Sequence, residues 1–429
     1  MSTLVVLIVL FLLLAIGTPV GFSMAIAGAL GLSLVGGVDL IFGILRTTPL
    51  STVQSYELLT IPLFILMAEF VLASGIADDL FKAAAAWFGR VRGGLAMATA
   101  VAGAGFGAIC GSSTASAATL SSTSLPAMIK QGYEPKLAAG VVAISGTLAM
   151  LIPPSVALVI YGLLAQVNIG KLLIGGIIPG IFVTLVIIAT VWLQVWQDPS
   201  RAPASAVRGW GEKMRMLAGV WPMLALFGTV TAVIYTGIAT PTEASAIGAF
   251  GALLLAIGFT RTPPVALMQA ARRASYSSCM IVMILIGAHV FGYFMTLTQV
   301  PQSMIAWVSG LDIPAWTVLA IILTAYIILG AFMDQIAILV LTVPIVLPVI
   351  VALGYDPLWF GVIAIVTAEV GMVTPPVGLN CFVVSRYAGR PLWEVFHGSF
   401  PHIVAHMFVI ATLLAFPEII LWLPSRMAH

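Results

Sequence analysis

The chain has 429 residues, of which 61% are hydrophobic and 7% are charged, and its formal net charge is +2. Soluble domains carry about 25% charged residues, so the composition excludes an ordinary soluble enzyme, and we expect no nucleic acid among the partners. Many apolar runs reach the roughly 20 residues that cross a bilayer, and the alternating pattern of an outer-membrane barrel is absent. The predicted fold class is an all-α polytopic protein of the lipid bilayer.

The first half of the chain is predicted to hold five spanning segments. The N-terminus has no basic region before its apolar run, so we expect a retained first helix rather than a cleaved signal peptide. A loop through Arg46 and Glu57 is expected between the second and third spans. The expected spans are Leu4–Ile16, Val20–Val35, Ile61–Ser74, Leu137–Ala165 and Leu172–Gln194.

Two further segments of this half do not have the pattern of a simple span. Ile76–Arg90 has an apolar face that includes Leu80, Phe81 and Trp87, which is typical of an arm lying along the membrane interface. Residues 95–128 are rich in glycine and serine, and Gly111–Thr114 places small hydroxyl residues in their middle. Bare backbone cannot face lipid, so this stretch is predicted to be the tip of a re-entrant helical hairpin.

The same order returns after a polar linker over residues 196–216. A second short arm is expected at Pro301–Gly310, and a second hairpin over residues 315–351 has Met333–Ile336 in its middle. The expected spans of this half are Pro222–Tyr235, Pro241–Phe259, Met280–Leu297, Leu358–Ser385 and His402–Leu423.

Four matches at one fixed spacing of 222 positions indicate an internal repeat. The alternative, two unrelated halves that share helix breakers, is disfavoured because the matches run along a whole half. We therefore predict a first repeat over residues 1–195 and a second over 217–429. The matches are Thr18-Pro19 with Thr240-Pro241, Pro126 with Pro348, Gly132–Pro135 with Gly354–Pro357, and Pro153-Pro154 with Pro375-Pro376.

An odd number of spans in each repeat makes the repeats run in opposite directions across the membrane, an architecture of many secondary transporters. Placing the linker in the cytoplasm puts 14 of the 17 Lys and Arg residues on that side, which agrees with the positive-inside rule. Both termini are then expected outside. The first hairpin enters from the cytoplasm and the second from the outer face.

The chemistry is expected at four irregular points: Gly111–Thr114, Ile152–Ser155, Met333–Ile336 and Thr374–Asn380. Interrupted helices at corresponding positions of two repeats indicate a transporter's binding site. Diprolines leave backbone carbonyls unpaired, and carbonyl and hydroxyl oxygens suit a hard cation such as Na⁺. The helix N-termini that follow each break suit a carboxylate.

Asp334 is the sharpest single signal, because an acid at membrane depth is functional by default. It falls at the position of Ser112 in the repeat, and the alternative is that it only holds its tip together. The tip serines could instead bond to their own backbone or permit close packing. Glu369 matches Thr147, and it could support the site or carry a proton.

For three other polar residues, a functional role is compared with a structural one. Thr240-Pro-Thr-Glu243 has the pattern of a capping box, and His289 is expected to pack between helices. Glu69 has no explanation in the sequence. No Lys or Arg falls near either tip, so an anionic substrate would need cations and helix ends to balance its charge, which predicts ion-coupled uptake. There is no Walker A motif for ATP.

Four motifs together resemble the large membrane subunit of the tripartite ATP-independent periplasmic (TRAP) transporters, over essentially the whole chain. The resemblance implies a bacterial inner-membrane transporter that imports organic acids with Na⁺ by an elevator movement of its hairpins and broken helices. The motifs are Gly111-Ser-Ser-Thr-Ala, Ile152-Pro-Pro-Ser, Ala239-Thr-Pro-Thr-Glu-Ala and Val373-Thr-Pro-Pro-Val-Gly-Leu-Asn.

The resemblance also implies two partners, a small four-helix membrane subunit and a periplasmic substrate-binding protein. The chain lacks the extension of fused members, so we expect the small subunit to be a separate polypeptide. One Na⁺ would lie between the first tip and the first diproline break, and another between the second tip and the second break. The candidate residues are Ser112, Ser113, Ser155, Gln335 and Asn380 for the small organic anion, and Gly111, Ser112, Thr114, Pro153, Asp334, Thr374 and Gly378 for Na⁺.

Three alternatives stay open at this point. A stand-alone Na⁺- or H⁺-coupled carboxylate symporter would have a similar architecture but would need no capture protein. An intramembrane enzyme could use Asp334 and Glu369 as an acid pair, although a repeat with two matched breaks argues against it. A passive channel is disfavoured because two re-entrant tips suit a site that must be occluded.

Overall fold

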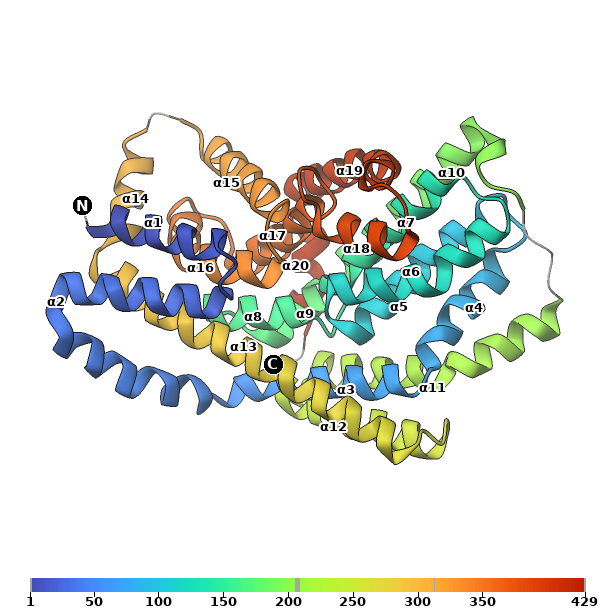
Figure 1. Ribbon diagram of the computed structural model, residues 1–429, viewed down its shortest axis with the longest axis horizontal. Helices are drawn as coiled ribbons and strands as arrows, with labels where there is room; N and C mark the ends of the chain where they lie inside the picture. The colour runs from blue at the N-terminus through green and yellow to red at the C-terminus, as the bar shows by residue number, and fades with distance from the viewer. Residues whose placement is uncertain (1, 205–208, 312, 428–429) are drawn as a thin grey trace.

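The computed structural model describes residues 2–204, 209–311 and 313–427, and all regular structure within them is helical. Eight of the described helices are long and apolar enough to cross a membrane, by length and composition. Figure 1 shows an elongated molecule with the α1–α2 pair at one end of its long axis. The predicted class, an all-α polytopic membrane protein, is confirmed.

The helices of the first half follow the predicted order. Short 3₁₀ turns lie at Tyr56–Leu59 (η1), Leu148–Met150 (η2) and Pro199–Arg201 (η3). The helices are α1 (Ser2–Ala15), α2 (Val20–Val53), α3 (Thr60–Ala73), α4 (Ile76–Phe88), α5 (Gly94–Cys110), α6 (Ser113–Lys130), α7 (Pro135–Thr147), α8 (Val156–Ala165), α9 (Ile169–Gly175) and α10 (Ile177–Gln197).

In the second half, α15–α18 recur at the 222-residue spacing of α5–α8, whereas the helices before and after them differ in length. In particular, α6 and α16 begin and end 222 positions apart, so the two hairpins break at equivalent residues. The helices are α11 (Trp210–Tyr235), α12 (Pro241–Gly258), α13 (Pro264–Leu297), α14 (Val300–Ser309), α15 (Ala315–Gly330), α16 (Gln335–Ala352), α17 (Pro357–Gly371), α18 (Leu379–Ala388), α19 (Leu392–Ala415) and α20 (Glu418–Ser425).

Three sequence-based boundaries were wrong. The loop expected after Val35 is helical, because Gly37, at φ 75° and ψ −174°, kinks α2 and the helix then continues to Val53. The stretch before Met280 was expected to be a loop because of its arginines, but its alanine-rich sequence extends α13 back to Pro264. The linker is shorter than predicted because α11 already begins at Trp210, and residues 205–208 lie outside the described part.

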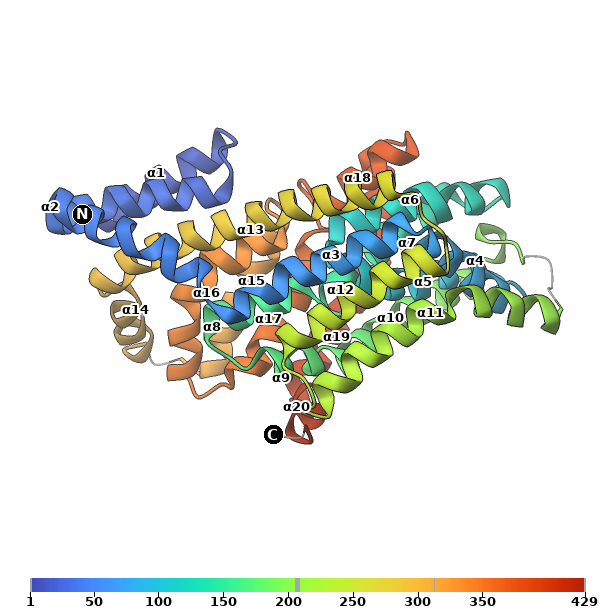
Figure 2. The ribbon, with the colours of Figure 1, turned by 90° about the horizontal axis from the view of Figure 1, so that it is seen from below.

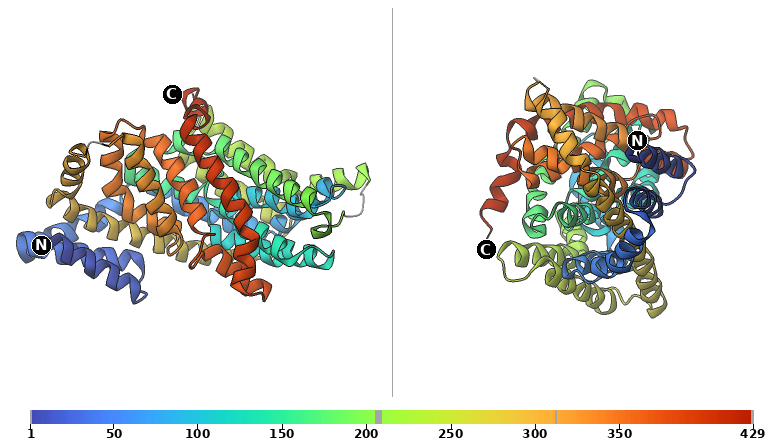
Figure 3. Two further views of the ribbon diagram at one scale, coloured as in Figure 1. Left: turned by 90° about the horizontal axis from the view of Figure 1, so that it is seen from above. Right: turned by 90° about the vertical axis from the view of Figure 1, so that its left-hand side faces the viewer.

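The helices form two groups. In one group α2 packs along α13 and α3 packs along α12, and this layer lies along the lower side of Figure 1, with α11 beside it. The other group contains both hairpins and both broken helices, seen above that layer in Figure 1 and from above in the left panel of Figure 3. The α8–α9 segment lies where the two groups meet in Figures 1 and 2.

The two halves are interlocked within the second group. Helix α6 of the first hairpin packs against α18 of the second half, and α16 of the second hairpin packs against α8 of the first half. A second crossing joins α7 to α19, where a Cβ added to Gly140 would lie 2.1 Å from the Gly398 carbonyl carbon. Glycine is required there because the two backbones touch. Each hairpin is therefore held by a helix of the opposite half.

Candidate functional site

The first tip is a helix break built from one glycine and one capping serine. Helix α5 ends at Gly111, whose φ of 55° lies in the left-handed region that glycine adopts without strain. Ser112 then caps α6, because its Oγ accepts a hydrogen bond from the Ala115 N–H at 3.4 Å. The hydroxyls of Ser112 and Thr114 lie 3.3 Å apart.

The first tip lies directly against the first diproline break. A Cβ added to Gly111 would lie 2.8 Å from Val156 Cγ2, at the start of α8. Ser155 caps α8 by accepting from the Leu158 N–H at 3.2 Å, and its hydroxyl donates to the Met150 carbonyl. The bonds Pro153-Pro154 and Pro375-Pro376 are both cis, so the two breaks share one backbone form.

The second tip lies against the second break in the equivalent way. Asp334 caps α16 by accepting from the Ile336 N–H at 3.1 Å. The Gly378 N–H donates to the Ala331 carbonyl at 3.1 Å and so ties the second break to the second tip. The Thr374 hydroxyl donates to the Val370 carbonyl at 2.6 Å.

A buried amide joins the first tip to the second break. The Asn380 Nδ2 group donates to Ser113 Oγ at 2.6 Å and to the Ala143 carbonyl at 3.3 Å. Asn380 and Ser113 have no exposed surface. Two of the irregular points therefore meet at one side chain, although they are far apart in the sequence.

The second tip uses its own amide for the equivalent contact. Gln335, which stands 222 positions after Ser113, donates from Nε2 to the Ile365 carbonyl at 3.1 Å. Ile365 in turn stands 222 positions after Ala143. The same backbone carbonyl of α7 and α17 thus accepts an amide in both halves, from Asn380 in one and from Gln335 in the other.

The candidate residues divide by exposure. Among the proposed substrate residues, Ser113, Ser155, Gln335 and Asn380 are fully buried and hydrogen-bonded within the protein. Ser112, Thr114, Pro153, Asp334 and Thr374 are half-buried, and Gly111 and Gly378 are buried at the tip and break. The half-buried residues are therefore the candidates that retain some exposed surface.

Several buried oxygen atoms at these breaks have no hydrogen-bond partner in the described part of the chain. They include Asn380 Oδ1, Gln335 Oε1 and both carboxylate oxygens of Glu369. Ser145 and Thr367, at matching positions of the two repeats, also have unpartnered hydroxyls. Sequence reasoning missed these two residues, and the fixed spacing was the signal that could have found them.

Three further residues that the sequence analysis weighed have structural partners. The capping box of Thr240 and Glu243 is present, which confirms that interpretation. His289 Nδ1 lies 2.8 Å from Thr52 Oγ1, so it joins α13 to α2 as expected. Glu69, unexplained by the sequence, pairs with Arg273 at 2.7 Å between α3 and α13.

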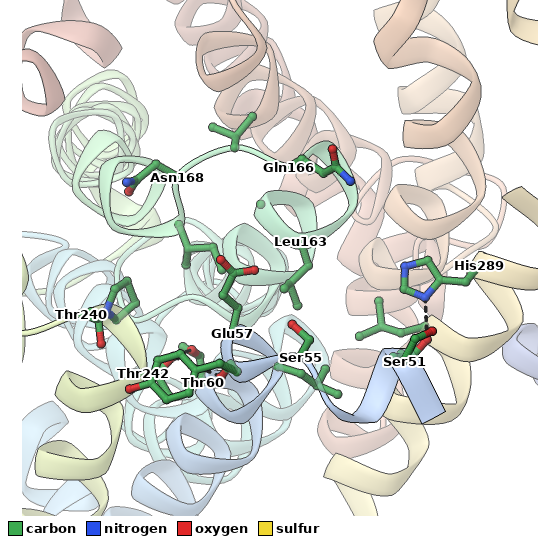
Figure 4. A pocket seen from close by; sticks show the side chains of 18 of the residues that line it. Ser51, Ser55, Glu57, Thr60, Leu163, Gln166, Asn168, Thr240, Thr242 and His289 are labelled. Atoms are coloured by element: carbon green, nitrogen blue, oxygen red, sulfur yellow. Dashed lines mark hydrogen bonds between the residues drawn. The ribbon is translucent and has the colours of Figure 1, made fainter. Parts of the chain in front are cut away.

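A cavity of about 670 Å³, which the sequence did not predict, separates the two helix groups. Figure 4 shows Gln166 and Asn168 of the α8–α9 turn on one side of it and Glu57 and Thr60 on the other. Its lining contains hydroxyls, one acid and His289, and the lining residues include no Lys or Arg. The cavity lies between the α8–α9 turn and the layer that contains α2, α3, α12 and α13.

Comparison with known proteins gives consistent matches along the chain. Residues 7–419 match the family model described as "Tripartite ATP-independent periplasmic transporter, DctM component". The C4-dicarboxylate TRAP transporter large permease protein DctM of Pseudomonas aeruginosa is 33% identical, with 87% of each chain covered. The ectoine/5-hydroxyectoine TRAP transporter large permease protein UehC of Ruegeria pomeroyi is 30% identical, covering 96% of this chain and 97% of that protein.

A solved structure shares the fold at lower sequence identity. The crystal structure of the YdaH transporter of Alcanivorax borkumensis matches with a TM-score of 0.61 and 13% identity. The match covers 98% of this chain and 99% of the other. At this identity the likeness concerns the arrangement of the helices.

Proposed function

The chain belongs to the family of DctM components of tripartite ATP-independent periplasmic transporters, and we propose that it couples the import of an organic acid to Na⁺. As a member, it is the large permease subunit of a secondary transporter, a multi-span helical protein of the inner membrane, and not an enzyme. Its proposed partners are a small four-helix membrane subunit and a periplasmic protein that delivers the substrate.

The Na⁺ proposal rests on one observation: each tip lies against a diproline break, and these segments contain no basic side chain. The half-buried oxygens of Ser112, Thr114, Asp334 and Thr374 lie at these breaks, and none of the four segments contains Lys or Arg. Oxygen ligands suit a hard cation. An anion bound at the same place needs that cation, because the helix N-termini supply only partial positive charge.

A carboxylate is the substrate class that this chemistry favours. The relatives from P. aeruginosa and R. pomeroyi are named for C4-dicarboxylates and for ectoine, both of which carry a carboxylate. The capped N-termini of α6 and α16 offer N–H groups to such a group. We propose that the hairpins and broken helices carry it across the membrane as an elevator, past the layer formed by α2, α3, α11, α12 and α13.

Reconstitution tests both the coupling and the partners. The full chain, its small subunit and the periplasmic protein are placed with proteoliposomes, and uptake of radiolabelled carboxylate is measured with a Na⁺ or a K⁺ gradient. We expect uptake with Na⁺ only. Equal uptake without Na⁺ would contradict the coupling, and uptake without the periplasmic protein would favour the stand-alone symporter.

The orientation of the hairpins is tested separately. We propose that both termini lie outside and that the hairpins enter from opposite sides. Single cysteines near Lys130 and near Asp356, placed in a variant that lacks the native cysteines, should react with a membrane-impermeant reagent from the cytoplasm and from outside, respectively. Labelling from the same side would contradict the inverted arrangement.

A further inference from the structure

Glu369 is a buried carboxylate for which the transport mechanism above has no use. It has no exposed surface, and neither of its oxygens has a hydrogen-bond partner in the described residues. The effective cost of burying an unpaired ion is several kcal/mol. A carboxylic acid that keeps its proton avoids this cost and gains an O–H donor. The side chain therefore needs either a bound cation or a bound proton.

The geometry of α17 places the amide of Gln335 near the backbone N–H of this acid. Gln335 Nε2 donates to the Ile365 carbonyl at 3.1 Å. In an α-helix that carbonyl points at the N–H of the residue four positions later, which is Glu369. The Gln335 side chain therefore ends at the level of Glu369. Its other polar atom, Oε1, is buried and has no donor.

We propose that Glu369 binds one proton and donates a hydrogen bond from its carboxylic acid to Oε1 of Gln335. An ionised Glu369 could not satisfy that oxygen, because a carboxylate and an amide oxygen are both acceptors. A single proton thus supplies the missing partner for both side chains. The neutral acid acts as a positioning residue that fixes the start of α16, and the proposal does not depend on Na⁺ coupling.

The ionisable groups on three elements that pack on α17 form hydrogen bonds with other partners. Asp334 of the second tip accepts from the Ile336 N–H, and Tyr326 of α15 bonds to the Thr342 hydroxyl at 2.6 Å. The hydroxyl of Tyr161 in α8 donates to the Pro357 carbonyl at 2.6 Å. None of them forms a hydrogen bond or ion pair with Glu369 in the described part of the chain.

The remaining helices that pack on α17 are α19, which carries two buried histidines, and α9 and α20. His406 Nδ1 lies 2.9 Å from the His402 carbonyl oxygen, and His402 Nε2 lies 3.5 Å from Gln194 Nε2 in α10. Helices α9 and α20 come together near the other end of α17, since a Cβ on Gly175 would meet both Leu358 and Pro424. No Lys, Arg or His forms a hydrogen bond with the carboxyl group of Glu369 in the described part of the chain.

The first half offers a natural comparison for this site. Thr147 stands at the position of Glu369, and its hydroxyl donates to the Ile144 carbonyl at 2.8 Å. Asn380 provides the amide there, and its Oδ1 stays without a donor. The proton is therefore assigned to the second half alone.

Infrared spectroscopy of the full chain in lipid nanodiscs tests this assignment. At pH 7 we expect the C=O band of a protonated carboxyl group that shifts on ¹³C labelling of glutamate. The band should be absent in Glu369→Gln and should remain in Asp334→Asn, the matched control for the other acid at a tip. A wild-type spectrum with no labelled carboxylic acid band overturns the proposal and points to a bound cation, whether or not the variants insert.

Uptake provides the second readout. Glu369→Gln keeps a donor for Gln335 Oε1 without any ionisable group, so its uptake should stay within about threefold of wild type. Glu369→Ala leaves that oxygen without a donor and should lose at least about tenfold. If an inserted Glu369→Gln protein is as inactive as Glu369→Ala, the charge of Glu369 is required and the proposal is wrong.

Discussion

The first tip is fastened to the opposite half of the chain, whereas the second tip is fastened to its own half. At the first, the Asn380 amide bridges Ser113 and the Ala143 carbonyl. At the second, Gln335 spans the equivalent distance alone and reaches the Ile365 carbonyl. Gln335 has a longer side chain than Ser113, which stands at the equivalent position of the first repeat. The second tip therefore needs no amide from the other repeat. The comparison teaches that the first tip depends on the second break, while the second tip does not depend on the first break in this way.

The largest expected effect comes from the difference in backbone conformation between the two tips. Gly111→Leu forces a side chain into the left-handed region, which costs about 1–2 kcal/mol, and drives it into Val156. Met333→Leu changes the equivalent residue of the second tip, whose φ is negative, and conserves volume. We expect uptake to fall by more than about tenfold in the first variant and by less than about twofold in the second. Equal losses would contradict the difference in backbone.

The next prediction compares the side-chain amides of Asn380 and Gln335. Asn380→Leu removes the Asn380 donor from Ser113 Oγ and one of the donors to the Ala143 carbonyl, and leaving a buried polar group unsatisfied costs about 1–3 kcal/mol. Hydrogen exchange should therefore accelerate at Ser113 and Ala115 of the first tip as well as around the second break. Gln335→Leu should accelerate exchange at the second tip only. If both variants loosen both tips, the fastening of the two halves is symmetric and the comparison fails.

A smaller effect distinguishes the two capping side chains. Ser112→Ala removes a cap worth about 1 kcal/mol. Asp334→Ala removes both a cap and the only carboxylate at a tip, so the Na⁺ concentration for half-maximal uptake should rise more, by about tenfold against a fewfold rise for Ser112→Ala. Membrane insertion, checked by the amount of protein in the membrane fraction, should be unchanged. A larger rise in Ser112→Ala would reverse the proposed roles.

The smallest effect is expected away from the tips. Arg273→Gln breaks the ion pair with Glu69, but the Arg273 side chain is 51% exposed, and such pairs contribute about 0–1 kcal/mol. Uptake and its Na⁺ dependence should stay within about twofold of wild type. A strong loss would mean that the α3–α13 contact takes part in transport, and the effects above could no longer be assigned to the tips alone.

Much of this arrangement could be predicted from the sequence, because helix breakers are residue types with direct backbone consequences. Glycine and the hydroxyl caps marked the first tip, diprolines marked both breaks, and the 222-residue spacing connected them. The acidic residues Asp334 and Glu369 identified the unusual polar positions of the second half. The same rules failed after Val35, where the expected loop is helical and Gly37 only kinks α2.

The hydrogen bonds from the two amides to α7 and α17 could not be predicted, because their acceptors are backbone carbonyls. Ala143 and Ile365 carry apolar side chains and give no signal of the amides that reach them. The role of Asn380 as a bridge to Ser113 depends on how α18 packs on α6, which no local pattern encodes. The ion pair of Glu69 with Arg273 depends in the same way on the packing of α3 against α13.

Hydrogen exchange of the wild-type chain in nanodiscs, measured in Na⁺ and in K⁺ at equal ionic strength, tests the central claim that both tips hold Na⁺. We expect Na⁺ to slow exchange at Ser113–Ser116 and at Gln335–Ile338, with little change in α3 and α12. Identical exchange in the two salts at both tips would contradict the claim, and protection of a single tip would limit the Na⁺ site to that half.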